Sequence, residues 1–209
     1  MQIRYVEYAR YCSHYLISIS KFINVFFNFL FLLVPYFLFL LRLMINMVYY
    51  KQLNNDDEYN TPKELWENVK EFLPTKEKIV WEAFYGNGKS GNILSNLGCT
   101  VIQSDVDFFE DNTKLIDICD VIVSNIPFSK KKEVLQRLKK INKPFMIIMP
   151  SSTMFTQYLR DIFNNEIQLI IPKTRMHYEK NGVVLKRTSF DSCYYCYKMN
   201  LHNDIIWLT

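Results

Sequence analysis

Short apolar runs that stop abruptly at polar residues, glycine or proline alternate along this chain with segments of helical periodicity. Strands joined through helices pair in parallel, so this alternation predicts an α/β fold: an open, mostly parallel sheet with helices on both faces. The last two runs flank a hairpin-like stretch around Asn181-Gly182, which predicts an antiparallel last strand. The expected strands are 79–81, 100–103, 120–124, 145–149, 167–171 and 190–199.

The helices between these runs are expected from apolar spacing and from capping residues. Thr61 is a good N-cap with Pro62 at the first helical position, and Pro74 stops the helix that Thr61 begins. A second helix follows Gly88 and closes at Gly98. Two more are expected: an amphipathic one whose inner face is Val134, Leu135, Leu138 and Ile141, and a short one near 153–164.

Composition places the chain among packed proteins. Of its 209 residues 49% are apolar and 16% aromatic, enough for one sizeable domain, which we assign to 47–209. The five cysteines are odd in number and unevenly spaced, which favours a reducing compartment, cytoplasmic or nuclear. Cys193 and Cys196 lie in one strand-like run and point to opposite faces, so we expect no metal site there.

The first 46 residues form a separate hydrophobic segment. Residues 22–41 carry no charge and are long enough to cross a bilayer, which would anchor the protein in a membrane. A cleaved signal peptide fits less well because no small-residue cleavage site follows the run. In the other interpretation, 1–46 is upstream sequence and translation starts at Met47.

The end of the first strand carries an acid and a glycine-rich turn. Glu82, Phe84, Gly86 and Gly88 stand at alternate positions before the second helix. The glycines let the backbone approach a ligand, and an acid this early suits a ligand with an ammonium group. With Gly91 the glycines also match a dinucleotide fingerprint, so a nicotinamide-linked oxidoreductase is an alternative.

The ends of the next two strands add groups suited to a nucleoside and a base. Asp105 or Asp107 could accept ribose hydroxyls, and Phe108 could cover an adenine face. The alternative is solvated aspartates and a core aromatic. After the third strand, Asn125 offers an amide, proline fixes the loop and Phe128 offers a ring, a set that could hold an extruded nucleobase.

Basic residues follow this loop. Between Lys130 and Lys143 there are seven lysines or arginines and one acid, and they could meet phosphates or simply be a solvated helix face. The net charge of +4 makes any nucleic-acid surface a local patch. Its candidate residues are Lys130, Lys131 and Lys132, with Lys173 and Arg175 in the 172–189 insertion.

Taken together, these motifs resemble the N6-adenine DNA methyltransferases, within the S-adenosylmethionine-dependent methyltransferases. Residues 82–88 look like the family's Asp-x-Phe-x-Gly-x-Gly cofactor motif, with Glu82 in place of Asp. Residues 59–62 look like its upstream Thr-Pro element, which would place Thr61 at the methionine moiety. Asn125-Ile126-Pro127-Phe128 looks like its Asn-Pro-Pro-Phe catalytic motif.

The resemblance covers about 59–200 and extends to methyltransferase-like proteins of large DNA viruses. It implies a Rossmann-like methyltransferase fold and an S-adenosylmethionine cofactor. The cofactor would be held by Thr61 and by residues at the ends of the first two strands: Glu82, Phe84, Gly86, Gly88, Asp105, Asp107 and Phe108. The resemblance also implies direct transfer of a methyl group to an exocyclic amine, most simply N6 of adenine in DNA rather than RNA. No metal is implied.

The sequence departs from the family pattern in two places. Ile126 replaces the first motif proline, so the loop has one less fixed backbone angle. Only about 20 residues separate Asp105 from Asn125, so the helix and strand usual there are expected to be very short or absent. Methylation of RNA or of a glutamine side chain, and a non-catalytic protein that binds nucleic acid or a partner, therefore remain open alternatives.

Overall fold

The computed structural model describes residues 59–180, 182–185 and 188–209. Contacts between Cα atoms divide the chain into Met1–Asn54 and Asn55–Thr209, and the described residues all belong to the second unit. The predicted hydrophobic segment 1–46, with its candidate membrane run 22–41, lies outside the described residues. Within the described part, no helix combines the length and apolar character needed to cross a membrane.

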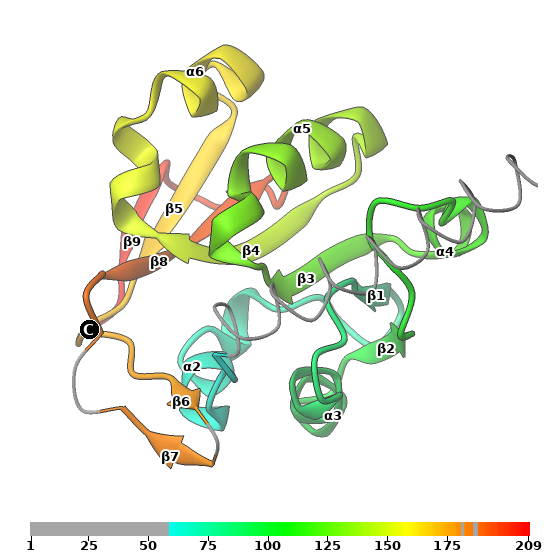
Figure 1. Ribbon diagram of the computed structural model, residues 1–209, viewed down its shortest axis with the longest axis horizontal. Coiled ribbons are helices and arrows are strands. Elements are labelled where there is room, and N and C mark those ends of the chain that lie inside the picture. Colours follow the sequence, from blue (N-terminus) through cyan, green and yellow to red (C-terminus); the bar gives the residue numbers. More distant parts are fainter. Residues whose placement is uncertain (1–58, 181, 186–187) are drawn as a thin grey trace, which may run out of the picture. The chain divides into compact units, whose positions relative to one another are not determined.

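A seven-stranded mixed sheet organises the second unit, in the order β2-β1-β3-β4-β8-β5-β9 (Figure 1). All neighbouring strands pair in parallel except β8, which is antiparallel to both β4 and β5. The α/β class and the antiparallel strand near the C-terminus are therefore confirmed. The strands are β1 Ile79–Glu82, β2 Thr100–Gln103, β3 Val121–Asn125, β4 Phe145–Pro150, β5 Ile167–Ile171, β8 Ser192–Tyr197 and β9 Ile205–Trp207.

Helices cover both faces of this sheet (Figure 1). One face holds α4 Thr113–Ile118, α5 Lys131–Ile141 and α6 Gln157–Phe163, and the other holds α2 Lys63–Glu67 and α3 Lys89–Asn96. Among the described residues there are also three 3₁₀ turns: η1 Lys70–Phe72, η2 Phe128–Lys130 and η3 Ser151–Phe155. A separate two-stranded hairpin consists of β6 Glu179–Lys180 and β7 Val183–Val184.

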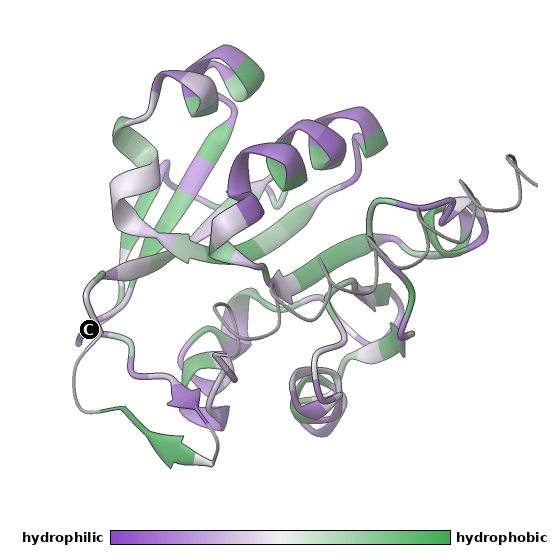
Figure 2. Cartoon of the chain, viewed as in Figure 1, coloured by the Kyte–Doolittle hydropathy of each residue, from purple (hydrophilic) through white to green (hydrophobic). Residues whose placement is uncertain are grey.

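Two apolar cores lie on opposite faces of the sheet because side chains alternate along its buried strands. In β8, Cys193 belongs to the core under α5 and α6, whereas Cys196 belongs to the core over α2 and α3. The two thiols thus point to opposite faces, as expected from the strand period. Figure 2 shows the same division in α5, whose sheet-facing side is apolar and whose outer side is hydrophilic.

The first helix differs from the sequence prediction. It begins at Lys63 with Pro62 in the cap position, and no side chain caps it, so Thr61 is not the N-cap. Thr61 is instead buried, with 2% of its surface exposed, because Asn60 just before it pairs with β6. The expected single helix also breaks after Glu67 into a turn and η1.

Two further features complete the comparison with the sequence. Between Asp105 and Asn125 the chain forms only the six-residue α4 and the strand β3 that Asn125 itself ends, so the elements of this link are short, as its length predicted. Strand β9 was not predicted: it has three residues and pairs in parallel with β5 at the edge of the sheet. A run this short carries no readable period.

The chain reverses direction across the sheet between β1 and β3. From β1 it crosses through α3 to β2 on one side, and then returns through α4 to β3 on the other side of β1. Ligands of open α/β sheets bind beyond the carboxyl ends of the strands at such a reversal. Glu82 ends β1 and Asn125 ends β3, so both lie at this point.

Candidate functional site

The loop after β1 takes the backbone shape that its glycines predict. Gly86 has a φ of +53° and Gly88 a φ of +75°, both in the left-handed region that favours glycine. Gly88 is also the residue that precedes the first turn of α3, and its N–H donates to the Tyr85 carbonyl at 2.7 Å. Any other residue at either position would strain the turn between Glu82 and α3.

The Glu82 carboxyl group is buried and only half satisfied. Glu82 is 1% exposed, and its Oε1 accepts a hydrogen bond from Ser124 Oγ of β3 at 2.5 Å. Oε2 is buried and has no hydrogen-bond partner among the described residues. A buried acceptor of this kind stabilises a fold only when a ligand or water satisfies it.

Burial also changes the charge of Glu82. Desolvation raises its pKa to about 7, and the hydrogen bonds from Ser124 and from the Phe84 backbone lower it only in part. The carboxyl group is thus close to half ionised at neutral pH. A cationic ligand group beside Oε2 would favour its ionised form.

The loop after β3 carries a second buried acceptor without a partner. Asn125 Nδ2 donates weakly to the Tyr59 carbonyl at 3.4 Å, and its Oδ1 is buried and makes no hydrogen bond to the described residues. Pro127 has a φ of −66°, its ordinary value, and precedes η2. The amide is therefore held by its nitrogen, while its oxygen is left for a donor.

Ile126 anchors this loop through its side chain. It is 3% exposed and belongs to the core cluster that includes Trp81, Ala83 and Phe108. Where the family motif has a proline ring to fix the backbone, this chain thus has an apolar side chain buried in the core. The substitution that departs from the motif has a structural role.

Truncating Ile126 to alanine should therefore destabilise the fold by about 2–4 kcal/mol, because it leaves a cavity in the core. Urea denaturation of the variant would measure the loss. Ile118→Ala is the matched control, since Ile118 is 52% exposed and its truncation should cost about 0.5 kcal/mol or less. Equal small losses in both variants would mean that Ile126 does not anchor the loop.

Phe128 belongs to an aromatic cluster that also contains Tyr59, Tyr178 and Phe190. Its ring meets Phe190 edge-on at 5.1 Å between centroids and Tyr178 at 6.1 Å, while Tyr59 packs on both of those rings. The cluster places Tyr178 of the insertion, and Phe190 just after it, directly against the loop of Asn125. This contact was not foreseen from the sequence.

We call the insertion, with the residues that end it, the strap (172–180, 182–185 and 188–191). The strap is tied to both candidate ligand loops through Glu179. The Glu179 backbone pairs with Asn60 through two hydrogen bonds, at 2.8 and 3.0 Å, and its carboxylate forms an ion pair with Lys89, the first residue of α3. The insertion that carries the candidate nucleic-acid residues Lys173 and Arg175 thus lies beside the glycine loop and beside Tyr59, whose carbonyl accepts from Asn125.

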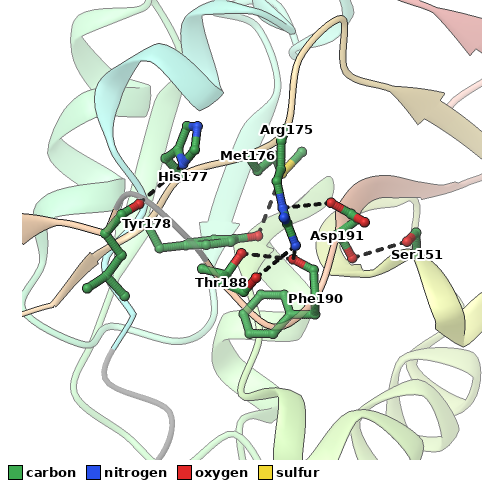
Figure 3. Close-up of polar contacts among 9 residues, drawn as sticks. Ser151, Arg175, Met176, His177, Tyr178, Thr188, Phe190 and Asp191 are labelled. Carbon is green, nitrogen blue, oxygen red and sulfur yellow. Dashed lines mark hydrogen bonds and ion pairs between the residues drawn. The ribbon is translucent and has the colours of Figure 1, made fainter.

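Arg175 holds the two arms of the strap together (Figure 3). Its Nε pairs with Asp191 at 2.8 Å, and its NH2 group donates to the carbonyls of Thr188 and Phe190 at 2.8 and 3.2 Å. The Asp191 carbonyl in turn accepts from Ser151 N at 2.7 Å, which ties the strap to η3. The predicted phosphate ligand Arg175 is thus engaged within the fold although it is exposed, and Lys173 on the same arm is exposed as well.

Replacing Arg175 with alanine should loosen the strap, because it removes three polar contacts that bridge its arms. Limited proteolysis should then cut within 172–191 several-fold faster than in the wild type. Lys173→Ala is the control, since Lys173 is exposed on the same arm and should leave the rate unchanged. Unchanged cleavage of both variants would contradict a latch role for Arg175.

The end of β2 only partly matches expectation. Asp105 is exposed, and Asp107 Oδ1 accepts from the Phe109 N–H at 2.9 Å in a tight local turn. Phe108 is 2% exposed and lies among core aromatics, 4.7 Å from the Phe84 ring centroid. The Phe108 ring therefore packs against the Phe84 ring inside the core and does not present an exposed face to a ligand.

The basic run after Asn125 is largely engaged with the protein itself. Lys131 Nζ donates to the Phe128 carbonyl at 3.2 Å, and Lys130 Nζ lies 5.0 Å over the Phe109 ring. Farther along α5, Arg137 donates to the Glu110 carbonyl at 2.5 Å and Lys139 pairs with Glu166. Lys132 is exposed and remains the best phosphate candidate of the first three lysines.

Sequence reasoning missed several polar groups at this edge. Besides the predicted Thr61, Glu82 and Asn125, buried oxygen atoms without a partner among the described residues occur in Gln103, Ser104, Thr153 and Ser192. Gln103 and Ser104 end β2, and Ser192 begins the antiparallel β8 beside the end of β4. The described residues contain no group of three His, Cys, Asp or Glu side chains able to hold a metal ion.

Comparisons with known proteins add little beyond this geometry. No family model matches the chain, and no curated protein matches it. Among solved structures, a precorrin-6y C5,15-methyltransferase from Geobacter metallireducens GS-15 aligns at 10% identity and a TM-score of 0.44, over 68% of this chain and 93% of its own. A tRNA (m1A58) methyltransferase from Aquifex aeolicus aligns at 16% identity and a TM-score of 0.42, over 66% of this chain and 69% of its own. At such identities and TM-scores neither likeness decides the function.

Proposed function

We propose that this protein binds S-adenosylmethionine and transfers its methyl group to an exocyclic amine, with N6 of adenine in DNA as the preferred substrate. The observation that carries the proposal is a pair of buried acceptors, Glu82 Oε2 and Asn125 Oδ1, at the carboxyl ends of the neighbouring strands β1 and β3. Neither atom has a hydrogen-bond partner in the part of the chain that the structure describes. One suits a cationic ligand group, and the other suits an amine N–H.

The residues around β1 fit the cofactor. Glu82 Oε2 would accept from the ammonium of its methionine moiety, and the buried hydroxyl of Thr61 is a further polar contact. Gly86 and Gly88 supply the left-handed backbone angles that shape the loop, and the exposed Asp105 would accept from ribose hydroxyls. The cofactor supplies an electrophilic methyl group attached to a sulfonium.

The residues around β3 would hold the methyl acceptor. Asn125 Oδ1 would accept one N–H of the amine and turn its lone pair toward β1, while Tyr59 fixes the amide nitrogen. Pro127 and the buried Ile126 keep the loop rigid, so orientation is set before the substrate binds. These residues work by position and hydrogen bonding, and no covalent enzyme intermediate is needed.

A nucleic-acid substrate is favoured by the position of exposed cations near this edge. Lys132 lies in the first turn of α5, and Lys173 lies on the strap. Both could contact phosphates while a base is held at Asn125. The number of such cations is small, which suits a short, local contact.

The experiment is a methyl-transfer assay of the full chain with radiolabelled S-adenosylmethionine. Adenine-containing DNA, RNA of the same sequence and a glutamine-containing peptide would be offered separately, and the product nucleoside identified by mass spectrometry. We expect N6-methyladenine from DNA. Label in the RNA or the peptide alone would change the substrate class, and cofactor binding without transfer to any of them would favour a non-catalytic binding protein.

A further inference from the structure

Ser124 is a buried polar residue next to both key residues of the proposed site: it is bonded to Glu82 and precedes Asn125 in the chain. It is fully buried, lies in β3 immediately before Asn125, and donates its hydroxyl to Glu82 Oε1 of β1 at 2.5 Å. A hydroxyl in the middle of a sheet of Val, Ile and Met side chains is costly unless its hydrogen bond is needed.

We infer that Ser124 is a positioning residue: its hydroxyl fixes Glu82 Oε1 so that Oε2 is presented to the cofactor's ammonium group. This inference rests on the proposed function, and it assigns to this serine the orientation of the cofactor carboxylate. Because Ser124 and Asn125 are consecutive, the same strand end orients both the acid for the cofactor and the amide for the substrate.

The geometry supports a single orientation. With Oε1 bonded to Ser124 Oγ at 2.5 Å, rotation of the carboxyl group away from this position would break the hydrogen bond. The remaining oxygen is buried and without a partner in the described part of the chain. A ligand cation is thus met by an acceptor that is already aligned.

The hydrogen bond also favours the ionised carboxyl group. Burial raises the pKa of Glu82, and the bond from Ser124 is the largest effect that lowers it again. The charged groups on the surrounding elements are Asp105 and Asp107 after β2, Lys89 of α3 and Glu179 of β6, and none of them contributes to the shift. Removing the hydroxyl should therefore raise the pKa of Glu82 further.

The test compares Ser124→Ala with Ser124→Cys, which keeps a weaker donor of similar size. Titration of the full chain by carboxyl carbon NMR, with the Glu82 signal assigned through Glu82→Gln, should show a higher pKa in Ser124→Ala and a smaller change in Ser124→Cys. S-adenosylmethionine should bind Ser124→Ala about tenfold more weakly than wild type at pH 7. That loss should shrink at higher pH, where Glu82 ionises in both.

A matched control separates this effect from loss of stability. Val121→Ala truncates another buried residue of β3, at its far end, and should weaken the fold without changing the Glu82 titration or the cofactor affinity. An unchanged Glu82 titration in Ser124→Ala would overturn the inference, as would a pH-independent loss of affinity equal to that of Val121→Ala. If wild type titrates as expected but binds no cofactor, the proposed function fails and the presentation to an ammonium group fails with it.

Discussion

Replacing Asn125 with alanine is expected to slow methyl transfer by about 100-fold or more, while the affinity for S-adenosylmethionine changes by less than about twofold. The reason is that Asn125 Oδ1 is the buried acceptor left for the substrate amine, whereas the cofactor groups lie on β1. Single-turnover assays would measure the methyl-transfer step, and calorimetry would measure the cofactor affinity.

Two variants make this result specific. Asn125→Asp keeps an oxygen acceptor but loses the amide hydrogen bond to the Tyr59 carbonyl, so it should retain more activity than the alanine variant. Asn96→Ala changes an exposed asparagine at the end of α3 and should behave as wild type. If Asn125→Ala loses cofactor binding together with transfer, the loop is structural and does not hold the substrate amine.

Replacing Glu82 with glutamine should weaken S-adenosylmethionine binding on the order of 100-fold, because a buried ion pair with the cofactor's ammonium group is lost. The same change should alter the pH dependence of stability in the protein without ligand. Glutamine occupies the same volume but cannot ionise, so it isolates the effect of the charge.

The sign of the pH effect follows from the raised pKa of Glu82, about 7 in the folded protein against the ordinary value of 4.5. Between these two values the folded state holds a proton that the unfolded state has released, so raising the pH costs stability. Wild type should therefore lose about 2–3 kcal/mol relative to Glu82→Gln between pH 5 and pH 8. Above pH 7 the loss is nearly complete.

Urea denaturation at pH 5, 6, 7 and 8 would measure this difference. Glu77→Gln is the control, since Glu77 is exposed before β1 and its change should leave the pH profile unaltered. A constant difference between wild type and Glu82→Gln across this range would show that Glu82 ionises normally. That result would contradict the proposal that Glu82 is a buried acid suited to a cationic ligand.

Much of the sheet was predictable because its strands are short, apolar and sharply ended. The apolar runs that form β1 to β5 and β8 each end at a polar residue, a glycine or a proline. The helical spacing of Val134, Leu135 and Leu138 predicted α5. The hairpin-like stretch before β8 gave its antiparallel direction. These are local sequence patterns, and they predict the fold correctly where the local preference agrees with the packing of the core.

Features that depend on tertiary pairing were not predictable. Thr61 has the sequence of a helix cap, but the pairing of Asn60 with Glu179 buries it. For Phe108 the sequence left open both an adenine contact and a place in the core, and only the packing against Trp81 and Phe84 shows that its ring lies in the core. The bond from Ser124 to Glu82 joins residues 42 positions apart, and only the parallel register of β1 and β3 brings them together.

The central claim is that the end of β1 binds S-adenosylmethionine through Glu82, and calorimetric titration of the full chain with that cofactor tests it most directly. The account predicts one cofactor per chain, binding on the order of 100-fold weaker in Glu82→Gln, and unchanged binding in Asn125→Ala. Absence of binding by the wild type, or equal affinity in wild type and Glu82→Gln, would contradict it.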